Sequence, residues 1–151
     1  MADVIEIKVE GLKEFEAELL GLPPKIADQT LQAALTMAAL PIVNEARARV
    51  PIAHEAYRLY GGGLATPGWL KQRIVRKKVK ETSDSAEVVV TIRDKRQAYF
   101  WKFIEFGTSK MAATPFMRPA FEAKQADALA RFVDRIKTGI QKAVTKLNYQ
   151  P

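Results

Sequence analysis

The strongest pattern in the sequence is a long apolar stripe in its last third, and it constrains the fold more than any other feature. Apolar residues recur there at helical intervals, which places them on one side of an amphipathic α-helix. Thr114 is expected to cap the start of this helix, and Pro115 or Pro119 to occupy its first turn, where a missing N–H costs no hydrogen bond. The stripe consists of Phe121, Leu129, Phe132, Val133, Ile136, Ile140 and Leu147.

The first half of the chain predicts three further elements. Residues 4–9 alternate between apolar and charged side chains, which is the pattern of a half-buried strand. A short amphipathic helix begins at Leu12 and ends at residues 21–24, GLPP. A longer helix is expected over residues 25–49, with a kink at Pro41, because proline removes a backbone donor.

The middle of the chain combines a glycine-rich loop with a predicted hairpin. Residues 60–69, YGGGLATPGW, contain four glycines, and we expect a mobile loop near residues 60–68. The spacing of these glycines fits neither phosphate-binding motif, so a nucleotide site is not expected. Residues 75–80 predict a strand with one strongly basic face, residues 82–85 a turn, and residues 86–93 a second strand.

The segment AYFWKFIEF, residues 98–106, is open to two interpretations. Its alternation fits a third strand, whereas Tyr99, Phe103 and Phe106 would also share one side of a helix. Together the elements predict one α+β domain over residues 1–151. In this fold a small antiparallel sheet packs against two long helices, one from the N-terminal half and one at the C-terminus.

Composition narrows the class of protein. A chain of 151 residues can bury a core without covalent staples, and the absence of cysteine excludes a disulfide framework and a thiolate site. No apolar run approaches the roughly 18–20 residues that a membrane helix needs. The N-terminus lacks the pattern of a signal peptide. These features are typical of a soluble intracellular protein, and no membrane partner is expected.

The formal net charge of +7 is unevenly distributed along the chain. Residues 71–80, KQRIVRKKVK, hold six basic side chains and no acid, and the C-terminal helix is basic after Asp134. Such a field attracts nucleic acid or an acidic protein face. For the C-terminal helix, the macrodipole is an alternative reason for the cations. The first 22 residues are instead acidic, with Asp3, Glu6, Glu10, Glu14, Glu16 and Glu18 against Lys8 and Lys13.

Side chains able to carry catalysis are scattered. His54 is the only histidine, so we expect a surface or capping residue rather than a metal ligand. No serine lies in a G-x-S-x-G motif and no acid–base pair is evident, so neither an enzyme nor a cofactor or metal site is expected.

Glu105 is the one carboxylate that needs separate treatment, because it stands among Phe103, Ile104 and Phe106. One interpretation is a functional acid. The other is a structural role, either in an ion pair or as an acceptor of backbone N–H groups from the GTSK turn that follows. We favour the structural interpretation.

The stretch FIEFGTSKMAATPFMRPAFE resembles the signature of a phage protein family. An aromatic segment is followed by E-x-G-T, by P-F-x-x-P-A and by a long C-terminal helix. The pattern is similar to that of the tailed-phage neck and tail-completion proteins of the HK-ninety-seven-type gene product ten family. Residues 52–69 depart from it, because this path is longer and richer in glycine than is usual there. The matching residues are Tyr99, Phe103, Glu105, Gly107, Thr108, Pro115, Phe116, Pro119 and Ala120.

The resemblance implies a tail-terminator-like fold and a structural protein of the phage neck. Such a protein would form a homo-oligomeric ring, expected to be a hexamer, around the DNA channel. Its neighbours would be head-closure or connector proteins and tail-tube or tail-terminator proteins. It would reside in the virion, and in the host cytoplasm during assembly, and would need no cofactor.

Two charged sets are candidates for contacts in such a ring. The acidic set would contact a neighbouring subunit, and the basic set either the same interface or, weakly, the phosphates of genomic DNA in the lumen. The acidic set is Glu14, Glu16 and Glu18, and the basic set is Arg76, Lys78 and Lys80.

The competing interpretation is a free-standing basic nucleic-acid-binding protein of α+β class. It would use the same basic strand and would stack bases on Tyr99 and Trp101.

Overall fold

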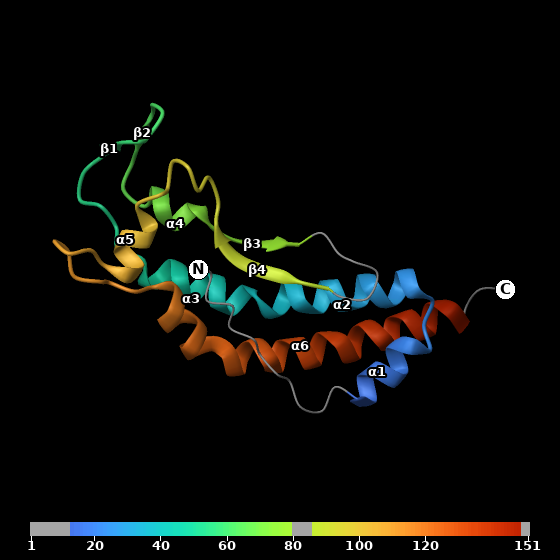
Figure 1. Ribbon diagram of the computed structural model, residues 1–151. Helices are drawn as coiled ribbons and strands as arrows, with labels where there is room; N and C mark the ends of the chain where they lie inside the picture. Colours follow the sequence, from blue (N-terminus) through green and yellow to red (C-terminus); the bar gives the residue numbers. More distant parts are fainter. Residues whose placement is uncertain (1–12, 80–85, 149–151) are drawn as a thin grey trace.

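Figure 1 shows a computed structural model of the chain, which describes residues 13–79 and 86–148. Its framework is a pair of long helical elements that lie side by side and run in opposite directions. The first is formed by α2 (Pro24–Ala38) and α3 (Leu40–Arg49), and the second is α6 (Met117–Asn148). Both long helices predicted from the sequence are confirmed.

Helix α1 (Lys13–Leu20) packs across the end of the molecule where α6 finishes. Its Phe15 and Leu19 join the apolar cluster shared by α2 and α6. The short helix predicted from Leu12 is therefore confirmed, and the strand expected over residues 4–9 lies outside the described residues.

The N-terminal long helix breaks at Ala39, two residues before Pro41. Pro41 has no N–H to donate to the carbonyl of Met37, and its ring crowds that turn. The N–H of Ala39 still donates to Leu35 O (3.1 Å), and the carbonyl of Ala39 accepts from Val43 N–H (3.1 Å). The predicted kink is confirmed, and the chain continues as helix beyond it.

Residues 24–49 pass, by length and composition alone, the criteria for a helix that crosses a membrane, and are the one such stretch among those described. Core helices meet the same criteria. Its buried residues Ala34, Val43 and Ala46 belong to apolar clusters that also contain α6 side chains, which is the arrangement of a core helix.

A β-hairpin lies on the side of α2 and α3 that faces away from α6 (Figure 1). Strands β3 (Ile74–Lys78) and β4 (Val88–Ile92) pair antiparallel, with Ile74 opposite Ile92. Both isoleucines are buried, so the hairpin face that contains them covers the helices. The side chain of Arg47 in α3 also donates to Ile74 O from Nε (3.1 Å) and Nη2 (2.7 Å). The predicted hairpin is confirmed, and its turn at residues 82–85 lies outside the described part of the chain.

The aromatic segment is a helix, and its interpretation as a third strand is wrong. After β4 the chain turns at Asp94, whose φ is 56° and whose carbonyl accepts from Gln97 and Ala98 N–H, both at 2.9 Å. The turn directs the chain away from the sheet, and α5 (Trp101–Phe106) follows. The side-chain spacing alone could not separate these outcomes over so short a segment.

The expected single sheet is in fact two separate hairpins. The second consists of β1 (Tyr57–Arg58) and β2 (Leu64–Ala65) and lies within the glycine-rich segment. Three glycines at its tip, residues 61–63, have φ between 84° and 100°, a range that side chains disfavour. Helix α4 (Trp69–Arg73) then leads into β3. The α+β class is confirmed, with the described strands divided between two small hairpins.

The C-terminal stripe buries Phe132, Ile136 and Ile140 as predicted, but Leu129 and Leu147 are exposed. The buried side of α6 contains small residues in addition to these large ones, because α6 and α2 approach closely. At Gly139, a Cβ atom would lie 2.6 Å from Cγ2 of Thr30 on α2. The small residues buried on α6 are Ala120, Ala128 and Ala143.

Candidate protein interface

A buried carboxylate fixes the start of α6. Glu105 in α5 is only 6% exposed. Its Oε2 accepts from the backbone N–H groups of Phe116 (2.8 Å) and Met117 (3.0 Å), and its Oε1 accepts from Arg118 N–H (3.0 Å). The first N–H groups of a helix have no partner within the helix, and a negative charge there is also favoured by the macrodipole. Glu105 therefore caps α6 from a separate helix and ties α5 to it.

The predicted structural interaction of Glu105 with backbone N–H groups is right in kind, but its partners differ. They belong to the first turn of α6 and not to the GTSK turn. We expected the side chain of Thr114 to cap α6, but the acceptors for its first N–H groups come from Glu105. The backbone N–H of Thr114 donates to Ile104 O (2.7 Å). Pro119 lies in the first turn of α6, as predicted, whereas Pro115 precedes the helix.

The loop between α5 and α6 depends on Gly107. This residue has φ 72° and ψ 177°, and a Cβ atom there would lie 2.8 Å from Ala113 N and 2.9 Å from Met111 O. Beyond it, Thr108 N–H donates to Met111 O (2.8 Å), and Thr108 Oγ1 accepts from Lys110 N–H (3.2 Å). Only glycine fits this close approach of two backbone segments.

The signature residues divide into an internal set and a surface set. Phe116 is fully buried in the core cluster where α3, α4, the β3–β4 hairpin and the start of α6 meet. Tyr99 and Phe103 instead project outward, as does their neighbour Phe106, which is not a signature residue and is 63% exposed. Tyr99 and Phe103 are in edge-to-face contact, with ring centroids 6.0 Å apart. The aromatic segment thus anchors the helix from one side and presents apolar surface on the other.

Exposed apolar side chains from three segments gather at this end of the molecule, where α5 and the β1–β2 hairpin lie (Figure 1). We call this surface the aromatic end. Contiguous exposed apolar surface is typical of sites of protein contact. The aromatic end consists of Ile52, Tyr60, Leu64, Tyr99, Phe103 and Phe106.

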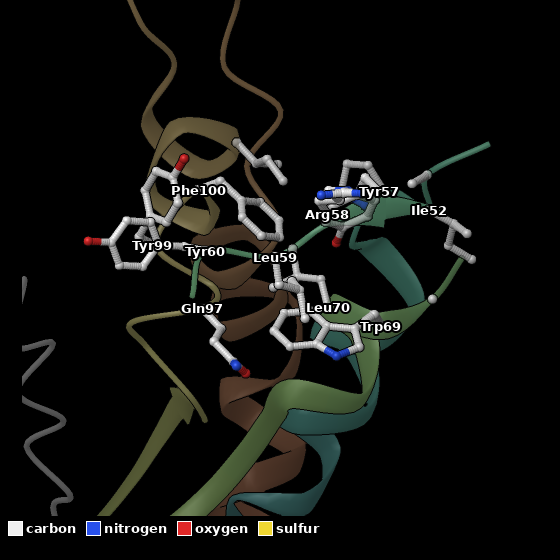
Figure 2. A pocket seen from close by; sticks show the side chains of 14 residues that line it. Ile52, Tyr57, Arg58, Leu59, Tyr60, Trp69, Leu70, Gln97, Tyr99 and Phe100 are labelled. Carbon is white, nitrogen blue, oxygen red and sulfur yellow. The ribbon is translucent and has the colours of Figure 1, made fainter. Parts of the chain in front are cut away.

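A hollow of 580 Å³ opens within the aromatic end (Figure 2). Its walls are mostly apolar and include Ile52, Leu59 and Trp69. Tyr57 and Phe100 meet there edge to face, with centroids 5.5 Å apart, and burial raises the pKa of the Tyr57 hydroxyl. Sequence reasoning missed the hollow, because its residues come from separate stretches, 51–60, 68–70 and 97–104, which only the fold brings together. The signal available was the set of aromatic and aliphatic residues on either side of the glycines at residues 61–63.

The basic strand does not present the open cationic face that its sequence predicts. Ile74, Arg76 and Lys78 alternate onto one face of β3, and this is the face that covers the helices. Arg76 is half-buried, and its Nη1 donates to Thr36 O in α2 at 2.5 Å. Lys78 is exposed, and Lys80 lies outside the described residues. One of the three predicted cations is thus committed to the fold.

The acidic set lies on α1, at the opposite end of the molecule from the aromatic end (Figure 1). Glu16 and Glu18 are exposed, and the side chain of Glu14 lies outside the described ones. No ion pair between described side chains joins α1 to β3, so the structure does not bring the two predicted charged sets together within one copy.

His54 is exposed, as predicted. Across residues 13–79 and 86–148, no group of three His, Cys, Asp or Glu side chains is placed to hold a metal ion. The feature of the described residues that suits a function is the aromatic end, which α5 and the β1–β2 hairpin present.

Residues 13–107 match the family model described as "Bacteriophage HK97-gp10, putative tail-component". The match includes Tyr99, Phe103, Glu105 and Gly107, and ends before Thr108 and the P-F-x-x-P-A motif. No curated protein and no solved structure matches the chain.

Proposed function

Because the chain belongs to the HK97 gp10-like family of bacteriophage tail components, we propose that it is a structural protein of the head–tail junction. In this role, copies of the chain form a closed ring around the channel through which DNA leaves the head. The ring joins a head-closure or connector protein on one side to a tail-tube or tail-terminator protein on the other. The observation that carries the proposal is the aromatic end, because exposed apolar surface of this kind marks a protein contact.

A closed ring needs two different, complementary surfaces on every copy. The elongated molecule has two unlike ends, one where α1 presents the exposed carboxylates Glu16 and Glu18 and one that is apolar at the aromatic end. Six copies are proposed by resemblance to tail-terminator-like rings. Contact with DNA in the lumen is weak in this proposal, because Arg76 is engaged with Thr36 O and leaves fewer free cations on β3.

A second candidate function is binding of single-stranded nucleic acid. The observation in its favour is an exposed pair, Tyr60 and Tyr99, with ring centroids 6.1 Å apart and the guanidinium of Arg96 5.8 Å from the Tyr60 centroid. Exposed aromatic rings beside arginine can stack bases. Trp101, the other predicted platform residue, is half-buried and packs near Phe106.

The two functions separate in one pair of measurements. Size-exclusion chromatography tests whether the protein co-elutes with candidate connector and tail-tube proteins, and fluorescence anisotropy measures its affinity for a labelled single-stranded oligonucleotide. Co-elution as a discrete complex, with weak and salt-sensitive oligonucleotide binding, supports the junction. A protein that does not co-elute with these partners and binds the oligonucleotide with submicromolar affinity supports the second function instead.

A further inference from the structure

The exposed face of α1 has the features of one half of a protein contact. Phe15 and Leu19 point inward to the cluster shared with α2 and α6. Glu16 and Glu18 point outward, and Leu20 is 79% exposed although it is a large apolar residue. Leu20 lies one turn from Glu16, so an exposed apolar side chain stands beside a carboxylate, which predicts a partner with an apolar hollow and positive charge at its edge.

The aromatic end has both of these features. The segments that build it, residues 51–73 and 93–106, contain seven lysines and arginines against three acidic residues. Two of the three acids are engaged within the molecule. Glu105 caps α6, and Asp94 Oδ2 lies 3.3 Å from Arg73 Nε and 3.8 Å from Arg93 Nε. The surface is therefore left with a positive balance.

Two of these cations lie beside the hollow itself. Arg58 is exposed and lines it (Figure 2). The guanidinium of Arg96 lies over the ring of Tyr60, another lining residue. Tyrosine, tryptophan and arginine are the residues that most often dominate the energy of a protein interface. The hollow is thus an apolar pocket with a cationic edge.

We propose that α1 of one copy docks on the aromatic end of a second copy. Leu20 enters the hollow between Ile52, Leu59 and Trp69, and Glu16 lies against the cations Arg58 and Arg96 at its edge, with Glu18 adding to the negative charge of α1. This contact rests on the proposed ring and names the surfaces that form it.

The position of the two surfaces supports a second copy as the occupant. They lie at opposite ends of the molecule and differ from each other, so one copy cannot satisfy its own surfaces and the contact is heterologous (Figure 1). Two cations elsewhere on the molecule already have partners within the same copy. Arg76 donates to Thr36 O, and Lys137 of α6 lies over Phe15 of the same copy, 6.0 Å from the ring centroid.

Charge exchange tests this contact. One variant carries Glu16→Lys and Glu18→Lys, and a second carries Arg58→Glu and Arg96→Glu. A third carries Leu20→Asp, which leaves the core intact because Leu20 is exposed. The matched control carries Asp127→Lys and Arg131→Glu, two exposed residues on α6. Far-ultraviolet circular dichroism checks that each variant is folded, and analytical ultracentrifugation over a concentration series measures assembly.

We expect each of the three variants to weaken assembly by about tenfold or more, and the control to assemble like the wild type. The equimolar mixture of the first two variants is expected to recover the wild-type mass, because each then offers the other a complementary surface. Wild-type assembly in all three variants would refute the α1 contact while leaving the ring in place. A wild type that stays monomeric, alone and with neck proteins, would refute the ring. Oligonucleotide binding that is lost only in the Arg58→Glu, Arg96→Glu variant, with no change in mass, would assign the aromatic end to nucleic acid instead.

Discussion

Removal of the Glu105 carboxylate should destabilise the protein more than any change to an exposed acid on the same framework. In Glu105→Ala, the N–H groups of Phe116, Met117 and Arg118 lose their acceptor. Water can reach the latter two, which are partly exposed, but Phe116 is fully buried. A buried N–H group left without an acceptor lowers the free energy of unfolding by roughly 1–3 kcal/mol. Loss of the negative charge at a helix N-terminus lowers it by up to about 2 kcal/mol more. We expect a total of about 1–5 kcal/mol.

The amide variant Glu105→Gln separates the charge from the geometry. A glutamine oxygen can accept from Phe116 and Met117 N–H, as Oε2 does now, but its NH2 group then faces the N–H of Arg118. One bond and the charge are lost and the buried donor stays satisfied, so the expected cost is roughly 1–3 kcal/mol. The protein should still fold and assemble.

Urea unfolding followed by circular dichroism measures both costs, and Glu122→Gln is the matched control. Glu122 is an exposed residue of α6 whose contact with Arg118 is a surface ion pair, so its loss should cost less than about 1 kcal/mol. For a domain of this size, the Glu105→Ala change corresponds to a melting temperature lower by roughly 2–20 °C. If Glu105→Gln and Glu105→Ala are no less stable than the control, the cap does not hold α6. If Glu105→Gln folds and assembles normally but abolishes a measurable catalytic activity, Glu105 is a functional acid after all.

Three further changes test other parts of the fold. Gly107→Ala should lower the free energy of unfolding in urea by roughly 2–4 kcal/mol, because of the positive φ and the close contact with Ala113 N. Gly107→Val should prevent folding or assembly, and a stable Gly107→Val variant would contradict the loop geometry. Gly139→Ala should destabilise the protein by about 1–2 kcal/mol through the contact of its Cβ with Thr30 Cγ2. Adding Thr30→Ser to the same chain removes Cγ2 and should recover most of this loss. Additive effects of the two changes would refute the close approach of α2 and α6. Because burial raises the pKa of Tyr57 above its ordinary 10.0, the folded state holds this proton more tightly, and stability should fall as the pH rises past 10. Tyr57→Phe should remove that part of the loss of stability. In an ultraviolet absorbance titration, the tyrosine ionisation seen at the highest pH in the wild type should be absent from the Tyr57→Phe variant.

The helices and the main hairpin could be predicted because their signals are local. The break before Pro41 follows from one missing N–H, and the β3–β4 hairpin follows from two alternating runs separated by a turn. Residues 98–106 could not be assigned, because nine residues fit both a strand and a helix. The turn at Asp94, which decides between them, is set by tertiary structure.

The candidate interface was predictable only in part. The sequence marked Glu105 as structural, but its partners lie 11–13 residues away, and their position depends on the path of the loop through Gly107. The alternation of β3 correctly grouped Arg76 with Lys78, but it could not show that this face covers α2. The aromatic end draws on segments far apart in the chain, so only the fold brings Ile52, Tyr60 and Tyr99 to one surface.

The mass of the native assembly tests the central claim most directly. Native mass spectrometry of the purified protein at low ionic strength resolves each oligomer as a multiple of the 16.9 kDa chain. The proposed ring predicts one discrete closed species, six times the mass of the chain, that persists on dilution and gains mass with its neck partners. A monomer of 16.9 kDa at every concentration, with or without those partners, would contradict it.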